Sequence, residues 1–273
     1  MRDLDKLLQY LKATSSEKSA LNIELNDLQQ FIRWISEIGL SARSQARVIS
    51  GIRNFFFYLI LEDEIVEDPS ELLELPKIGK KLPEVLSIDE IDQLKASIDM
   101  SKNEGHRNRA IIETLYSCGL RVSELINLKI TNIYFEEGFI RVIGKGNKER
   151  LVPVSAGVEK EINIYRNLVR VHQEIKSGHE DFLFLNRRGA KLTRVMIFTI
   201  IKNLAKEIDL KKKISPHTFR HSFATHMVEG GANLRAIQEM LGHESISTTE
   251  IYTHLSNDLL KEAIISYHPR NKS

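Results

Sequence analysis

Cysteine is nearly absent from this sequence of 273 residues, which contains only Cys118. A single cysteine excludes an internal disulfide and any zinc site built from several thiolates. A free cysteine is usually a small buried hydrophobic residue, and we expect the same of Cys118. A nucleophilic thiol is the less favoured alternative.

Long apolar runs are also missing. The longest, such as residues 55–61, are far shorter than the roughly 20 residues that span a bilayer. The first residues, Met-Arg-Asp-Leu-Asp-Lys, lack the apolar stretch of a signal peptide. Low-complexity tracts and internal repeats are absent as well. We therefore expect a cytoplasmic protein with no membrane association.

The composition that remains is that of an ordinary globular protein, with 42% hydrophobic and 28% charged residues. The chain length favours two domains with separate cores. Net charge is only +2, but residues 141–213 carry 17 Lys and Arg against 8 Asp and Glu. Such a basic stretch suits a polyanion such as DNA, although a solvated lysine-rich surface would have the same composition.

The first 75 or so residues show the spacing of amphipathic helices. The second of these helices ends at Gly39. The third begins near Ser41 and runs past Leu59. Its polar face carries Arg43, Arg47 and Asn54. This face is a candidate DNA contact or an ordinary wet surface.

Proline, glycine and lysine gather between residues 75 and 83, which indicates a linker. Ser87-Ile88-Asp89-Glu90 has the pattern of a capping box that opens a new helix. We therefore predict a helical domain at 1–78, a linker at 79–86 and a second domain at 87–273, which includes a C-terminal helix.

The second domain combines helices with a small sheet. Residues 106–117 and 121–128 read as helices, and 139–143 pairs with 150–154 as a β-hairpin around Gly144-Lys145-Gly146-Asn147-Lys148-Glu149. Residues 182–185 are a candidate further strand. From about residue 193 a series of helices is broken by Gly230-Gly231 and Gly242. The predicted fold is mainly α with a small β-sheet: an all-α domain followed by an α+β domain.

Four clusters carry the chemistry of this second domain. They are Gly119-Leu120-Arg121-Val122-Ser123-Glu124-Leu125, the hairpin Gly144 to Arg150, His217-Thr218-Phe219-Arg220-His221, and Leu241-Gly242-His243 followed by Thr248 to His254 around Tyr252. In order and spacing they resemble the tyrosine recombinase, or phage integrase, family, and most closely its Xer site-specific recombinases. The resemblance implies a DNA-clamping first domain and a catalytic second domain.

The resemblance assigns the reaction to six residues. Tyr252 would attack the scissile phosphodiester, with Arg121 and Arg220 gripping its oxygens through planar, permanently charged guanidinium groups. Lys145 would protonate the departing 5′ oxygen, and Lys148 competes for that role. His217 and His243 would donate to the phosphate oxygens and help to move the tyrosine proton. For each residue taken alone, a structural or surface role is the competing interpretation.

Glu124 lies three residues after Arg121, on the same helical face. The resemblance implies that it orients active-site groups. A simple surface carboxylate is the alternative.

No metal or cofactor is expected. His217 and His221 have the i, i+4 spacing of zinc ligands, but Thr218 stands where the zinc motif requires glutamate, and Arg220 would repel a cation. His221 and His226 are better interpreted as packing or supporting residues. No Gly-x-x-x-x-Gly-Lys-Ser/Thr loop is present, as suits a reaction that conserves phosphodiester bond energy and needs no ATP.

The predicted function is therefore site-specific DNA recombination through a covalent 3′-phosphotyrosyl intermediate, of the Xer type that resolves chromosome dimers at a terminus site. The compact layout, without an added arm-binding domain, favours this over an integrase of a mobile element. A catalytically inactive DNA-binding regulator is the alternative from another class. Expected partners are double-stranded DNA with a specific recombination site, a tetramer of this chain or with a paralogous recombinase, and a DNA translocase activator.

Overall fold

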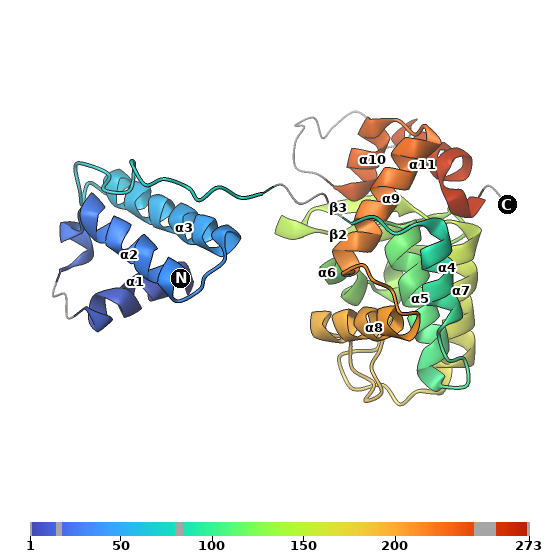
Figure 1. Cartoon of the computed structure of the whole chain (residues 1–273). Helices are drawn as coiled ribbons and strands as arrows, with labels where there is room; N and C mark the ends of the chain where they lie inside the picture. The colour runs from blue at the N-terminus through green and yellow to red at the C-terminus, as the bar shows by residue number, and fades with distance from the viewer. Residues whose placement is uncertain (1, 15–17, 80–83, 243–254, 272–273) are drawn as a thin grey trace. The chain divides into compact units, whose positions relative to one another are not determined.

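A computed structural model describes residues 2–14, 18–79, 84–242 and 255–271. The chain divides into two compact units, Met1–Leu82 and Pro83–Ser273, and each is described by itself (Figure 1).

All regular secondary structure among the described residues of the first unit is helical. It consists of α1 (Arg2–Ala13), the short 3₁₀ helix η1 (Ala20–Asn22), α2 (Leu25–Glu37) and α3 (Ala42–Leu61). Its core is built around Leu28, Phe31 and Phe56, which are all fully buried. Gly39 follows α2 with a positive φ of 84°, as expected for a residue that ends a helix.

The second unit surrounds a small sheet with helices (Figure 1). Its elements are, in chain order, α4 (Ile88–Ala96), α5 (Asn103–Ser117), α6 (Val122–Ile126), η2 (Ile130–Asn132), β1 (Ile133–Tyr134), β2 (Phe139–Ile143), η3 (Lys145–Asn147), β3 (Glu149–Pro153), α7 (Ala156–Leu168), η4 (Arg170–His172), α8 (Arg194–Glu207), α9 (Pro216–Gly230), α10 (Leu234–Leu241), α11 (Leu255–Tyr267) and η5 (Pro269–Asn271). In Figure 1, α10 and α11 lie at one end of this unit and α8 at the other.

The sheet is antiparallel with strand order β1-β2-β3. The predicted hairpin is confirmed, with Ile143 opposite Glu149 at its closed end. The prediction of a strand at 182–185 is wrong: these residues form only isolated bridges, Phe182 with Lys129 and Leu185 with Lys191. The third strand is β1, which is too short to be seen as a pattern in the sequence.

Helix boundaries agree with the sequence where capping residues mark them. The capping box that opens α4 is present, because Ser87 Oγ accepts from the Glu90 backbone N–H at 3.1 Å and Glu90 accepts from the Ser87 N–H at 2.7 Å. Gly231 and Gly242 end α9 and α10 in the left-handed conformation. The helix predicted at 121–128 is shorter, since α6 ends at Ile126. Helix α7 has no counterpart in the prediction.

Helix α11 packs against β3, α10 and α9 of its own domain. Leu260, Ala263 and Ile264 are buried there. The segment that follows is anchored by the His268 ring, which lies against the Tyr116 and Phe223 rings at centroid distances of 5.0 and 5.6 Å. The C-terminal helix is thus part of the core of the second unit.

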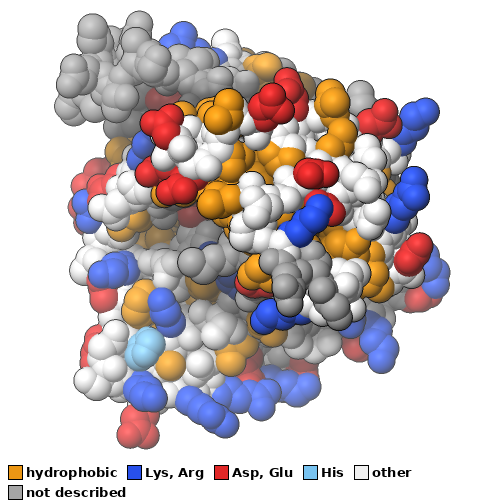
Figure 2. All heavy atoms as spheres, turned by 90° about the vertical axis from the view of Figure 1, so that its left-hand side faces the viewer, with side chains coloured by type: hydrophobic (Ala, Val, Ile, Leu, Met, Phe, Trp, Pro, Cys, Tyr) orange, Lys and Arg blue, Asp and Glu red, His pale blue; other side chains and the backbone are white. Residues whose placement is uncertain are grey.

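No helix among the described residues is long and apolar enough to cross a membrane. Figure 2 shows one face of the molecule, on which apolar side chains lie among charged and polar ones.

Candidate active site

The site begins at the N-terminus of α6, where Arg121 is the N-cap. The Arg121 backbone N–H donates to Glu124 Oε2 at 2.8 Å, and its guanidinium Nη1 donates to Glu124 Oε1 at 2.9 Å. Glu124 is 4% exposed, so the interpretation as a simple surface carboxylate is wrong. The turn at Gly119, with φ of 57°, delivers Arg121 to this position.

A third residue, Arg150 on β3, holds the same carboxylate from the hairpin. Its Nη1 donates to Glu124 Oε1 at 2.8 Å and its Nη2 to Oε2 at 2.9 Å, which is the bidentate geometry of a strong ion pair. Burial disfavours the charged carboxylate, but the bonds from Arg150 and Arg121 outweigh it and lower the pKa of Glu124. Glu124 is therefore ionised at neutral pH.

Sequence reasoning missed Arg150. The hairpin motif contains it, yet no role was assigned, because its partners lie 26 and 90 residues away in the chain. The only local signal is an arginine at the start of a strand whose next residues are apolar.

The last turn of α10 joins all three arginines. Three successive carbonyl oxygens each accept from a different guanidinium: Met240 from Arg150 Nε at 2.7 Å, Leu241 from Arg220 Nη2 at 2.6 Å, and Gly242 from Arg121 Nη2 at 3.0 Å. Carbonyls at a helix C-terminus lack partners within the helix and carry the negative end of its dipole. The C-terminal end of α10 therefore holds the three guanidinium groups close to one another.

Arg220 is the most deeply buried of the predicted pair, at 7% exposed. Its Nη1 also donates to the Gly119 carbonyl at 2.8 Å, so it ties the turn before Arg121 to the end of α10. Burial, and then the nearby positive charge of Arg121, lower the pKa of Arg220 to about 10. It remains charged at neutral pH.

Two further predicted residues lie on elements around this cluster. His217 is exposed in the first turn of α9, three positions before Arg220, so both lie on one helical face. Lys145 opens η3 at the tip of the β2–β3 hairpin, whose neck is closed by a Gly144 N–H donating to the Lys148 carbonyl at 2.8 Å. His243 and Tyr252 lie outside the described residues, in the segment between α10 and α11.

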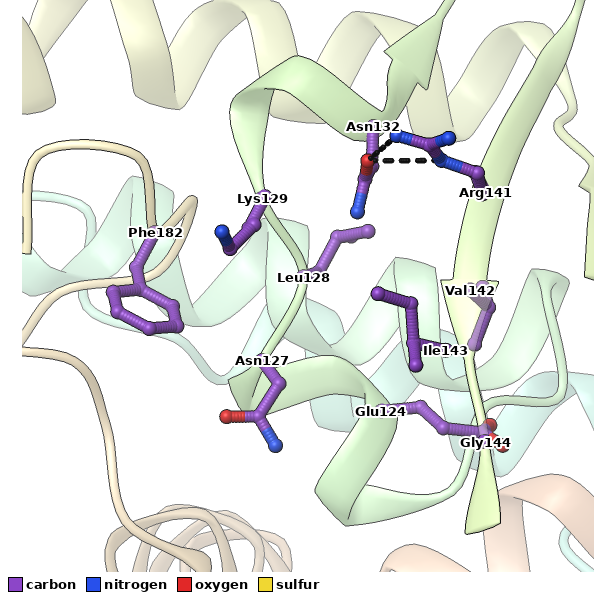
Figure 3. Close-up of a pocket in the computed structure, with 10 residues that line it drawn as sticks. All are labelled: Glu124, Asn127, Leu128, Lys129, Asn132, Arg141, Val142, Ile143, Gly144 and Phe182. Atoms are coloured by element: carbon purple, nitrogen blue, oxygen red, sulfur yellow. Dashed lines mark hydrogen bonds between the residues drawn. The ribbon is translucent and has the colours of Figure 1, made fainter. Parts of the chain in front are cut away.

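A pocket of about 300 Å³ lies beside this cluster, with Glu124 and Gly144 at one end (Figure 3). Two of its polar side chains bind one another: Arg141 donates to Asn132 Oδ1 through Nε at 3.1 Å and Nη2 at 2.7 Å. Neither Arg121 nor Arg220 lines it. The pocket is therefore separate from the place where the guanidinium groups converge.

The remaining predicted residues are placed as follows. Arg43, Arg47 and Asn54 lie exposed on α3, where Arg47 also forms an ion pair with Asp3 at 2.9 Å. His226 is buried and shares a hydrogen bond of 2.8 Å with the Tyr116 hydroxyl, which is the packing role expected of it. Cys118 is fully buried, and burial raises the pKa of its thiol, so a nucleophilic role is disfavoured.

Comparison with known proteins identifies the class to which this fold and site belong. Residues 84–258 match the model of the phage integrase family, and residues 1–63 match the phage integrase N-terminal SAM-like domain. The chain belongs to the phage integrase family.

Several curated relatives are tyrosine recombinases that share one name. The chain is 41% identical to tyrosine recombinase XerD of Listeria innocua over 98% of its length and 91% of that protein. It is 43% identical to tyrosine recombinase XerD of Staphylococcus haemolyticus over 98% of its length and 90% of that protein.

Solved structures of recombinases also resemble this chain. The crystal structure of XerA recombinase matches with 31% identity and a TM-score of 0.55, over 98% of this chain and 89% of that one. XerH bound to a palindromic difH substrate, in a post-cleavage complex, matches with 28% identity and a TM-score of 0.73, over 96% of this chain and 77% of that one.

Proposed function

We propose that this protein is a site-specific DNA recombinase of the Xer type, which cuts and rejoins double-stranded DNA through a covalent 3′-phosphotyrosyl bond to Tyr252. The observation that carries the proposal is the convergence of Arg121 and Arg220 on the end of α10. A DNA phosphodiester is a stable anion, and its cleavage needs preorganised positive charge on the non-bridging oxygens. Two fixed guanidinium groups supply that charge.

In the cleavage step, the Tyr252 oxygen forms a bond to phosphorus and the bond from phosphorus to the 5′ oxygen breaks. A histidine of the site, His217 or His243, accepts or relays the phenol proton, because phenol is un-ionised near pH 7. Lys145 protonates the departing 5′ oxygen as general acid. Religation reverses these transfers, so no external energy source is needed.

Glu124 serves this chemistry by orientation. It accepts from the Arg121 backbone and guanidinium at once, which fixes the direction in which that guanidinium points. Its negative charge also reduces the repulsion among Arg121, Arg150 and Arg220. The net charge of the four groups stays positive, as phosphate binding requires.

The relatives support DNA as a partner. XerH is bound to a difH substrate in two structures, a pre-cleavage complex and a post-cleavage complex, which supports a defined DNA site for this chain. We propose four protomers on two sites, of this chain alone or with a paralogous recombinase, and activation by a DNA translocase. The exposed Arg43, Arg47 and Asn54 of α3 would contact DNA from the first domain. Chromosomal DNA as substrate implies the cytoplasm.

Chromosome dimer resolution is the favoured role, because relatives named XerD match over nearly the whole chain. Integration of a mobile element is the second candidate. A regulator without catalysis would have no use for the arrangement of Arg121, Arg220 and Glu124.

The decisive test is Tyr252→Phe on a nicked duplex that carries the recombination site of the host replication terminus. Phenylalanine keeps the ring but has no oxygen to attack phosphorus, so covalent adducts should disappear while specific binding stays near that of the unmodified protein. Adducts should be followed by denaturing gel electrophoresis and binding by gel shift. An adduct formed by the variant would assign the nucleophile to another residue.

Metal dependence gives an independent test. We expect EDTA to leave the cleavage rate unchanged, because Lys145 and the two histidines perform the acid and base work that bound metal ions perform in other nucleases. Loss of cleavage in EDTA, restored by added magnesium or zinc, would indicate a different nuclease class.

A further inference from the structure

Arg150 is bound within the protein through every nitrogen of its side chain. Its Nε donates to the Met240 carbonyl, and its two terminal nitrogens donate to the two oxygens of Glu124. The side chain is 12% exposed. A guanidinium with this geometry is suited to holding elements in place and not to binding a phosphate directly.

The elements that it joins are those that carry the proposed chemistry. Arg150 lies on β3, opposite Val142 of β2, and therefore belongs to the hairpin whose tip is Lys145. Glu124 belongs to α6, whose N-cap is Arg121. Met240 lies in the last turn of α10, shortly before the segment that contains His243 and Tyr252. One side chain thus links three separate parts of the site.

The neck of the hairpin lies beside the ion pair of Glu124 and Arg150. Gly144 directly precedes Lys145, and a Cβ at Gly144 would lie 3.7 Å from Glu124 Oε1 and 3.8 Å from Arg150 Nη1. Figure 3 shows the Glu124 side chain extending toward Gly144 at the end of β2. The backbone that leads into Lys145 therefore lies directly beside the pair formed by Glu124 and Arg150.

We propose that Arg150 is a positioning residue for the cleavage reaction, which fixes the hairpin and hence Lys145 at a set distance from the phosphate held by Arg121. This inference rests on the function proposed above, in which Lys145 is the general acid. Misplacement of a catalytic group by about 1 Å costs on the order of 100-fold in rate. Loss of Arg150 should therefore slow the step that needs the lysine while leaving DNA binding intact.

The test uses the full-length protein and two versions of the nicked terminus-site duplex, one with the natural 5′ oxygen at the scissile phosphate and one with sulfur in its place. A thiol has a pKa near 8.5, whereas that of an alcohol is close to the value of about 16 for water, so sulfur departs without a proton donor. Cleavage of the sulfur substrate therefore bypasses the general acid. Single-turnover rates at saturating protein report the chemical step.

Lys145→Ala tests the proposed function by itself. The variant should cleave the oxygen substrate slowly, and its cleavage rate should recover on the sulfur substrate. Without that recovery, Lys145 is not the general acid, and the proposed mechanism is wrong whatever Arg150 does.

Arg150→Ala tests the further inference. We expect a loss of about 10- to 100-fold on the oxygen substrate, and recovery to within about threefold of the unmodified protein on the sulfur substrate. Arg121→Ala should stay slow on both, because the phosphate charge still needs neutralising. If Lys145→Ala recovers but Arg150→Ala stays equally slow on both substrates, or is not slow at all, Arg150 does not position the lysine.

Two further variants guard against a trivial loss of structure. Arg150→Lys keeps the charge but lacks the planar fork that spans both Glu124 oxygens, so it should show the same recovery with a smaller initial loss. Arg141→Ala removes an arginine from the neighbouring strand, whose hydrogen bonds go to Asn132 and whose ion pair goes to Glu149 at 3.6 Å, and it should leave both rates unchanged. Thermal denaturation and gel shift on all variants confirm that the protein compared is folded and bound.

Discussion

At the scale of single residues, Arg121 and Arg220 differ in what surrounds them, and their loss should differ accordingly. The Arg121 side chain is 34% exposed, whereas Arg220 is buried and donates to two backbone carbonyls. Both should be needed for cleavage. Only Arg220 should also be needed for stability, because its removal leaves two buried acceptors without partners.

We therefore predict that Arg121→Ala and Arg220→Ala each lower the cleavage rate by at least about 100-fold, the usual cost of losing a preorganised oxyanion donor. Arg220→Ala should in addition lower the free energy of unfolding by about 1–3 kcal/mol. Cleavage at saturating protein and denaturant unfolding measure the two effects. Rates within a few-fold of the unmodified protein would remove the arginines from the phosphate site.

The sequence identifies Arg121, Glu124 and Arg220 because each lies in a short motif with local spacing. It does not identify Arg150, whose structural role depends on hydrogen bonds to Met240 and Glu124 in other elements. The physical reason is that an ion pair between distant segments leaves no periodic pattern in either one. A residue in a recognised motif can be nominated from the sequence, whereas a long-range support of this kind cannot.

At the scale of elements, the segment after α11 is held by a buried histidine. His268 is fully buried, its Nδ1 accepts from the Arg270 backbone N–H at 3.2 Å, and its ring contacts Tyr116 and Phe223. Burial lowers the pKa of His268 from 6.5 to about 4; the charge of Glu113 opposes this, and those of Arg270 and His226 add to it. The folded protein therefore holds this histidine neutral.

A histidine with a depressed pKa stabilises the fold fully above pH 6.5, and this contribution is lost as the pH falls toward 4, because only the unfolded chain gains the proton. We predict that the melting temperature falls over this range and that His268→Asn makes the fall shallower, by an amount on the order of 3 kcal/mol in unfolding free energy. Asparagine keeps an acceptor for Arg270. His172→Asn, at an exposed position, is the matched control. Identical slopes for His268→Asn and the unmodified protein would contradict the prediction.

Elements are predictable where capping residues or glycines mark their ends, as for α4, α9 and α10. The short apolar run at 182–185 has the composition of a strand, but it only bridges to Lys129 and Lys191. Tertiary packing decides such runs, since Leu183 and Leu185 are buried without strand pairing. For residues 182–185, the sequence alone predicts that the side chains are buried, but it does not predict which backbone groups they pair with.

At the scale of the whole molecule, the chain contains two hydrophobic cores that share no residue. One includes Phe56 of the first unit, and the other includes Phe223 of the second. The cluster of proline and glycine near residue 79 indicates a boundary in the sequence, and the structure divides after Leu82. Composition can predict a domain boundary because linkers lack apolar periodicity.

We predict two separate unfolding transitions in calorimetry of the full chain. Phe56→Ala should lower the free energy of unfolding of one domain by about 3–5 kcal/mol and leave the transition of the other domain in place. Phe223→Ala is the matched variant in the second core and should have the reverse effect. A single transition displaced as a whole by either substitution would show that the two cores unfold as one.

The end of α10 also has a consequence for how the protein tolerates mutation over evolutionary time. At this helix end, the acceptors that hold Arg121, Arg150 and Arg220 are main-chain carbonyls, which no change of side chain can delete. Sequence drift in α10 therefore leaves the support of the site in place as long as the helix forms. The exception is Gly242, where a Cβ would approach Arg150 Cδ to 3.1 Å and the φ of 64° disfavours other residues. Within this helix end, Gly242 is therefore the position where a substitution would most disturb the support.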